Sequence, residues 1–149
     1  MFNIESKKNI SMVSLTYSIS DSAKAISALA LLSKKAINID MISMSPTGAG
    51  KVSLAFSFDD ADFSDLMIVL SEFRKDHFDL KISVRNDNVK ILISDDEMKN
   101  QSGVAEKVLS ALIKEGIEII MVTTAETEIS LLINAEDLER TTQIIKNND

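Results

Sequence analysis

Hydrophobic and polar positions along the chain repeat with two different periods. Segments 9–17 and 88–94 are short runs rich in β-branched residues, which strands favour. Segments 22–36 and 102–116 instead place apolar residues three and four positions apart, with Lys or Glu between them. This spacing predicts two amphipathic helices, and we expect the serine at the start of each helix to cap exposed backbone N–H groups.

Two further segments alternate with a period of two and follow the predicted helices. They read INIDMIS at 37–43 and IEIIMVT at 117–123, and we expect both to be strands. A second strand follows each of them, at 51–58 and at 128–134. The glycines and the proline of segment 46–50 predict a hairpin turn and not a phosphate-binding loop, because the segment joins two strands and does not open a helix.

The order of these elements forms an internal repeat. Residues 9–73 and 88–147 both read strand, helix, strand, strand, helix. The first copy ends in another alternating strand at 79–85, whereas the second copy has no closing strand. We expect residues 2–5 to supply it, with a frayed N-terminus as the alternative. The predicted fold class is α+β, with two ferredoxin-like βαββαβ units and the N-terminal unit inserted into the C-terminal one.

Two stretches of this repeat resemble a known family. They are SDSAKAISALALLSKKAINIDMISMS (20–45) and DDEMKNQSGVAEKVLSALIKEGIEIIMVTTAETEISLLI (95–133), and they are similar to the tandem ACT domains of the aspartokinase regulatory region. The family's Pro-Gly turn is replaced by Ser22-Ala23 and Ser102-Gly103, and the asparagine of the following strand by Glu118 in the second copy. The resemblance implies ACT units at 9–87 and at 88–149 with strand 2–5, and a homodimer that pairs ACT sheets.

The family also has a catalytic domain that opens with a Lys-Phe-Gly-Gly-Thr-Ser stretch, and this chain contains no such stretch. We therefore expect no catalytic domain here and no cofactor. The chain is interpreted as a freestanding regulatory protein or as the regulatory part of an aspartate kinase, with a kinase domain or subunit as its partner. The resemblance implies lysine or threonine as the effector.

An amino-acid effector needs N–H donors for its carboxylate and oxygen acceptors for its ammonium group. The N-terminus of the first helix offers the donors, and the polar positions after that helix are placed by the resemblance beside the ligand. The alternative for these positions is that Asn38 caps a turn and Asp40 faces water. Extended by the resemblance to the second copy, the candidate effector-binding residues are Ser20, Asp21, Ser22, Ala23, Lys24, Asn38, Ile39, Asp40, Gln101, Ser102, Gly103, Val104, Glu118 and Ile119.

Composition removes several other classes of function. The net charge of −7 is unfavourable for binding nucleic acid or anionic membranes. The chain has no cysteine and a single histidine, His77, which we expect at the surface. The N-terminal stretch lacks a signal-peptide core, so we expect a cytoplasmic protein. The aspartates at 59, 60 and 62 are interpreted as helix caps and not as a metal site, and Met41, Met44 and Met121 as core or interface residues.

Two functional classes remain. The first is an amino-acid-sensing allosteric module, and the second is a ligand-free ACT-type module for dimerisation or interaction. RNA binding on a ferredoxin-like sheet would need basic charge and exposed aromatic residues on the central strands, and the sequence has neither.

Overall fold

The computed structural model describes residues 1–76 and 79–149, so His77 lies outside the described residues. Within these residues, each of the four helices is preceded by a short 3-10 turn: η1 (Ile19–Asp21), η2 (Asp60–Asp62), η3 (Asp96–Asn100) and η4 (Ala135–Asp137). The strands and helices are β1 (Asn3–Ser18), α1 (Ser22–Lys34), β2 (Ile42–Gly48), β3 (Lys51–Asp59), α2 (Phe63–Asp76), β4 (Lys81–Ser94), α3 (Val104–Lys114), β5 (Ile119–Thr124), β6 (Glu128–Asn134) and α4 (Leu138–Asn147).

The chain forms two compact units. The N-terminal unit is Asn9–Asn86, and the C-terminal unit combines Met1–Lys8 with Asp87–Asp149. Hydrogen-bonded strands follow the order β2-β3-β1-β4 in the first and β1-β4-β6-β5 in the second, because β1 and β4 each contribute to both. Each unit is therefore a ferredoxin-like βαββαβ arrangement. The α+β fold class and the insertion of the N-terminal unit are confirmed.

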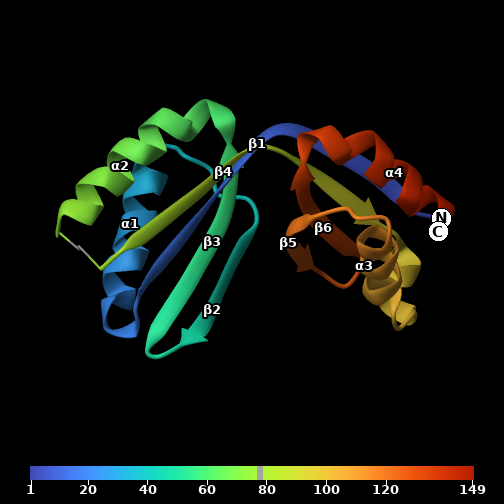
Figure 1. Ribbon diagram of the computed structural model, residues 1–149, viewed down its shortest axis with the longest axis horizontal. Coiled ribbons are helices and arrows are strands. Elements are labelled where there is room, and N and C mark those ends of the chain that lie inside the picture. The colour runs from blue at the N-terminus through green and yellow to red at the C-terminus, as the bar shows by residue number, and fades with distance from the viewer. Residues whose placement is uncertain (77–78) are drawn as a thin grey trace. The chain divides into compact units, whose positions relative to one another are not determined.

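The N-terminal unit buries its helices against one face of its strands, as Figure 1 shows for α1 and α2. The face is apolar because every second residue of a strand points to the same side. It carries Val13, Leu15 and Tyr17 from β1 and Val52, Leu54, Phe56 and Phe58 from β3, and the helices add Ala25, Leu32, Leu66, Val69 and Leu70. The buried face of α2 is thus formed by Leu66, Val69 and Leu70.

The C-terminal unit has a core of its own. Its strands contribute Val89, Ile91, Ile93, Ile129, Leu131 and Ile133, and its helices contribute Val108, Leu112 and Ile145. Phe2 and Ile4, from the N-terminal segment, pack against this core. The segment predicted at 2–5 therefore provides side-chain contacts as well as a strand, and the frayed alternative is wrong.

The two strands that follow the first helix of each unit begin later than the alternating pattern predicts. The expected strands 37–43 and 117–123 are in fact β2, which starts at Ile42, and β5, which starts at Ile119. The helix ends explain the difference. The N–H of Ile37 donates to the Leu32 carbonyl at 3.1 Å and that of Ile117 to the Leu112 carbonyl at 3.0 Å, so both isoleucines close a helix C-cap.

Left-handed backbone occurs at the helix caps and at the hairpin. Ala36 and Gly116 precede the capping isoleucines with φ of 58° and 77°. In the β2–β3 hairpin, Ala49 and Gly50 are the two turn residues, with φ of 52° and 72°, which is the pattern of a type I′ turn. The hairpin interpretation of segment 46–50 is confirmed, although β2 itself extends to Gly48.

The predicted serine caps are wrong, whereas an aspartate cap is present. The hydroxyl of Ser22 donates to the Ile19 carbonyl at 2.7 Å, and the N-cap positions of α1 and α3 are Asp21 and Gly103. A glycine at that position has no side chain to cap with. Asp59, by contrast, accepts from the Ala61 N–H at 2.9 Å, as expected for the acidic cluster.

Candidate functional site

The loop before α1 is fastened to the β2–β3 hairpin. The N–H of Ile19 donates to the Gly50 carbonyl at 2.8 Å, and the Lys51 ammonium donates to the Ser18 hydroxyl at 3.3 Å. These contacts place η1 and the first turn of α1 beside the turn that joins the two strands. These two hydrogen bonds therefore hold the backbone of the candidate loop in place.

The five candidate residues of the first loop lie in η1 and in the first turn of α1. Ser20, Ala23 and Lys24 are exposed, and Asp21 and Ser22 are half-buried. Lys24 and Asp21 form an ion pair, with 3.3 Å between the ammonium and a carboxylate oxygen. Among the described residues, no side chain at the N-cap position accepts from the first-turn N–H groups of α1. The loop therefore presents one charge of each sign at the start of a helix whose first N–H, that of Ser22, already donates to the Ile19 carbonyl.

The candidates Asn38, Ile39 and Asp40 follow the C-cap of α1 in extended backbone. Asn38 and Asp40 are exposed and Ile39 is half-buried, so the alternation that the sequence predicts is present here without a strand assignment. The segment joins the sheet through its backbone, because the Asp40 N–H donates to the Ser57 carbonyl at 3.1 Å. The Asn38 side chain thus points away from the core on an anchored segment.

The second unit repeats this arrangement with different side chains. Gln101, Ser102 and Gly103 form an exposed loop before α3, and Val104 is its first helical residue. The loop lacks a charged pair comparable to Asp21–Lys24 within the part of the chain described. Gly103 has φ of 84°, a left-handed conformation that only glycine adopts at low cost.

Beyond α3, Glu118 occupies the position that Asn38 has in the first unit, and Ile119 begins β5. The Asn134 amide donates to a Glu118 carboxylate oxygen at 3.3 Å. The second unit therefore has a carboxylate, held by a neighbouring amide, where the first has an amide of its own.

The structure brings the residues of each loop together but separates the two halves of each predicted site. Ser22 and Asn38 lie at opposite ends of α1, whose 13 residues span about 20 Å. Val104 and Glu118 are likewise at opposite ends of α3, whose 11 residues span about 16 Å. A free amino acid is only several ångströms long. Within one unit, a single effector therefore cannot contact both halves.

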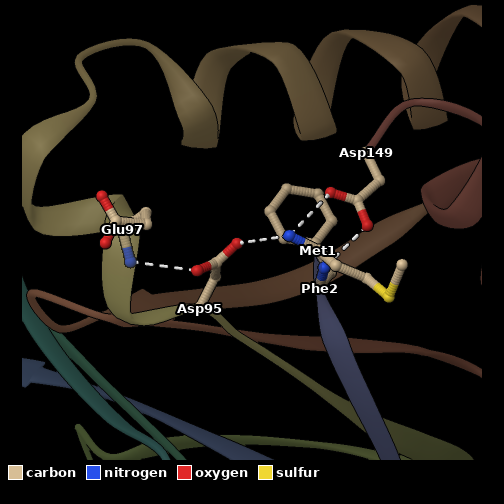
Figure 2. Close-up of polar contacts among 5 residues, drawn as sticks. All are labelled: Met1, Phe2, Asp95, Glu97 and Asp149. Carbon is tan, nitrogen blue, oxygen red and sulfur yellow. Dashed lines mark hydrogen bonds and ion pairs between the residues drawn. The ribbon is translucent and has the colours of Figure 1, made fainter.

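Asp95 organises the corresponding end of the C-terminal unit, as Figure 2 shows. Its carboxylate accepts from the Glu97 N–H at 2.9 Å and from the Met1 ammonium at 3.0 Å. The Asp95 N–H donates to the Thr127 carbonyl at 3.1 Å, which mirrors the contact of Ile19 with Gly50. Asp149 accepts from the Phe2 N–H at 2.7 Å. These contacts fix the N-terminal segment beside η3.

The polar contacts of Asp95 change the acidity of two groups. The Glu97 N–H, and after it the Met1 ammonium, hold the pKa of the Asp95 carboxyl below its usual value. The bond to Asp95, helped by the charge of Asp149, raises the pKa of the Met1 ammonium. The Met1 ammonium is exposed and the Asp95 side chain is half-buried at the surface, so we treat this cluster as an anchor of the chain and not as a reactive centre.

Sequence reasoning missed two residues beside the candidate loops. Asp95 caps η3, and its position at the start of the acidic stretch before a turn was the available signal. Tyr17 lies beneath the start of α1 and is 2% exposed. The only available signal in the sequence was its position as an aromatic residue at the end of a predicted strand.

Comparisons with known proteins agree with this architecture. Residues 91–148 match the family model of the ACT domain. An aspartokinase from Bacillus sp. (strain MGA3) is 31% identical over 108 residues, which are 72% of this chain and 26% of that protein. The chain thus spans about a quarter of the length of this curated relative.

Solved structures extend the likeness to nearly the whole chain. The aspartokinase alpha and beta subunits match with a TM-score of 0.86 at 25% identity, over 97% of this chain and 95% of that one. The ligand-free regulatory subunit of aspartate kinase from Thermus thermophilus matches with a TM-score of 0.86 at 20% identity, with the same coverage. Across residues 1–76 and 79–149, no helix is both long and apolar enough to cross a bilayer. The family match and these likenesses support an aspartokinase-like ACT regulatory domain.

Proposed function

We propose that the chain is an amino-acid-sensing allosteric module that regulates an aspartate kinase activity in the synthesis of aspartate-family amino acids. The catalytic partner is a kinase domain or subunit, and the setting is cytoplasmic. The observation that carries the proposal is the likeness over 97% of the chain to the aspartokinase subunits. The exposed loops before α1 and α3 supply the chemistry that an amino acid requires.

Both units are proposed to be ACT domains, at residues 9–87 and at 88–149 with strand 2–5. The family model covers residues 91–148, which lie in the C-terminal unit. The N-terminal unit has the same element order, the same helix C-cap and the same fastening of its loop to a hairpin. These shared features support the assignment of the first unit.

The effector carboxylate is proposed to bind at the start of α1, near Ser20 to Lys24. First-turn N–H groups and the positive end of the helix dipole favour an anion there, and the Lys24 ammonium adds a charge of the right sign. The effector ammonium is assigned to Asn38 and Asp40, whose oxygens are the matching acceptors. The equivalent second-unit positions are Gln101 to Val104 with Glu118 and Ile119.

Because α1 separates these two halves, we infer that the site is completed by a second copy of the chain. A two-fold axis perpendicular to α1 places the start of that helix in one copy beside the segment after it in the other. The edge strand β2 supports such pairing, because Ile42 and Met44 on it are 48% and 52% exposed. The protein is thus expected to be a homodimer with two equivalent effector sites.

Lysine is the first candidate effector and threonine the second. The net charge of −7 favours a cationic amino acid, and Asp40 and Glu118 are both exposed acidic residues after the first helix of their unit. Threonine carries no net charge and would gain nothing from this field. Binding of lysine in preference to threonine would therefore show that the effector is selected by its charge.

A thermal-shift panel of the twenty amino acids tests the proposed function. A ligand that binds only the folded state stabilises it by about 2.7 kcal/mol at a hundredfold excess over Kd, so lysine should raise the melting temperature by several degrees. Arginine is the matched control for charge without the same side-chain length. No shift with any of the twenty amino acids would exclude amino-acid sensing.

The second candidate function is a ligand-free module that pairs sheets. The specific observation in its favour is the exposed apolar edge of β2, which needs a partner whether or not an effector binds. Sedimentation with and without lysine separates the two functions. A dimer indifferent to every amino acid supports the interaction module, whereas a monomer of 16.4 kDa at tens of micromolar in all conditions contradicts both.

A further inference from the structure

A small cavity lies beneath the first turn of α1, on the core side of the candidate loop. Its walls come from the end of β1, from η1 and the first turn of α1, from α2, and from the residue just before β4. The lining residues are Tyr17, Asp21, Lys24, Ala25, Phe73 and Leu80. It leaves about 10 Å³ for the centre of a water molecule. That volume suits one water and excludes an organic ligand.

The Tyr17 hydroxyl is the reason to ask what the cavity contains. The side chain is 2% exposed, and the hydroxyl has no hydrogen-bond partner among the described residues. A buried hydroxyl without a partner is rare in folded proteins, because it has lost its hydrogen bonds to water. A phenol is protonated at neutral pH and can donate, and burial raises the pKa of Tyr17 further.

Two other residues that line the cavity carry groups that complement this donor. Asp21 has a carboxylate that accepts, and Lys24, its ion-pair partner, has an ammonium that donates. A buried water needs two to four polar partners, and Tyr17, Asp21 and Lys24 provide up to three. A cavity with only apolar walls would stay dry; this one is lined mostly by apolar surface, and its polar groups are those of Tyr17, Asp21 and Lys24.

We propose that this cavity is a binding site for one internal water molecule, which accepts from the Tyr17 hydroxyl and donates to the Asp21 carboxylate. The water links the end of β1 to η1 and α1 across a gap that the side chains do not close directly. It is a structural ligand of the first unit, and its presence does not depend on the effector function proposed above.

A second buried hydroxyl provides a matched control. Thr141 in α4 is 0% exposed, and its hydroxyl likewise has no partner in the described part of the chain. Thr141 does not line the Tyr17 cavity. Replacing a truly unpaired hydroxyl by an apolar group of the same shape is neutral or stabilising, whereas removing one that is bonded is destabilising.

The test compares Tyr17→Phe with Thr141→Val in urea, followed by far-ultraviolet circular dichroism. Tyr17→Phe should increase the unfolding constant about two- to tenfold through loss of the water-mediated bond, and Thr141→Val should leave it unchanged or lower it. If Tyr17→Phe is as stable as the wild type or more stable, the hydroxyl is unpaired and the water site is wrong.

Two further measurements distinguish loss of the water from a change in packing caused by the substitution. In a double-mutant cycle of Tyr17→Phe and Asp21→Ala, the two effects on the unfolding constant should fail to multiply, because both variants remove the same bridge. Independent effects would contradict a shared water. In a high-resolution crystal structure of the wild type, we expect an ordered water within about 3.2 Å of the Tyr17 hydroxyl oxygen. A cavity without density would overturn the proposal.

Discussion

The ends of α1 and α3 are built to the same backbone plan with different residues. Both helices close with a hydrogen bond from an isoleucine N–H to a leucine carbonyl, namely Ile37 to Leu32 and Ile117 to Leu112. The left-handed residue before the isoleucine is Ala36 in one helix and Gly116 in the other. The fold thus requires the cap geometry but not a particular residue, provided that the strain of an alanine is tolerated.

The positions just outside this shared cap are where the units differ in chemistry. Two residues after the left-handed position stands Asn38 in the N-terminal unit and Glu118 in the C-terminal unit, both exposed. At the other end of the helices, the charged pair of Asp21 and Lys24 contrasts with Gly103. The repeat therefore preserves its scaffold and varies its exposed polar groups, so the candidate sites of the two units are not equivalent.

The largest effect is expected from removing residues 1–7, which only the C-terminal unit needs. The deletion takes away one strand of that unit with the half-buried Phe2 and Ile4, a loss on the order of 1.5–3 kcal/mol from apolar burial alone. Hydrogen exchange should show lost protection in β6 and retained protection in β3. Equal protection in both strands would show that the second unit does not depend on this segment.

The next effect concerns the difference between Asn38 and Glu118. If Asn38 contacts the effector, Asn38→Ala should weaken binding by about 1–3 kcal/mol, or five- to more than a hundredfold. The fold should persist, because Asn38 is exposed. Calorimetric titration of lysine into wild type, Asn38→Ala and Glu118→Asn measures both sites together. If only Glu118→Asn abolishes binding, the occupied site is in the C-terminal unit.

A smaller effect of opposite sign is expected at the two left-handed positions. Ala36→Gly should stabilise by about 0.5–1 kcal/mol by relieving strain, and Gly116→Ala should destabilise by about 1 kcal/mol. A Cβ at Gly116 would meet no described atom within 4 Å, so the cost there is purely conformational. Urea unfolding of the two variants checks the pair, and changes of the same sign would contradict a shared cap.

The smallest effect is expected on the pKa of Tyr17, a residue that has no counterpart in the C-terminal unit. Tyr17 is the only tyrosine of the chain, so the absorbance of phenolate reports on it alone. Because burial raises its pKa, the titration midpoint of the folded protein should lie above the ordinary value of 10.0. Folding then favours the protonated phenol. Its contribution to stability is complete below the unfolded pKa and is lost as the pH rises through the folded pKa. A midpoint at or below the ordinary value would contradict the burial.

Much of this fold could be predicted from periodicity, and the exceptions have a local cause. The hydrophobic repeat predicted four helices and the strand segment at 2–5, and the predicted strand at 128–134 coincides with β6. Strand β2 begins later than predicted. The alternating pattern starts at Ile37 and continues through Ile39 and Met41, but Ile37 still belongs to the helix cap and the strand begins only at Ile42. A period of two indicates extended backbone and does not show where ladder hydrogen bonds begin.

The candidate site could be predicted less well from the sequence. Residue types and spacing indicate the loops before α1 and α3, since a helix start attracts anions wherever it occurs. They do not indicate that Ser22 and Asn38 are a helix length apart, because that depends on how the chain folds back. The cavity at Tyr17 was out of reach for the same reason, as its far wall comes from Phe73 and Leu80, which are distant in sequence.

The strand segment at 2–5 also sets an order for folding during synthesis. All four strand segments of the N-terminal unit lie within Asn9–Asn86, so that unit can fold as soon as residue 86 is clear of the ribosome. The other unit must wait, since its contacts join residues as distant as Met1 and Asp95, which are 94 positions apart, and Phe2 and Asp149, which are 147 apart. Closing such long loops is slow. The N-terminal segment can pair with β4 before Asp149 emerges, but until Ile145 emerges Phe2 and Ile4 lack part of the core that covers them, and such transiently exposed apolar side chains are what chaperones bind.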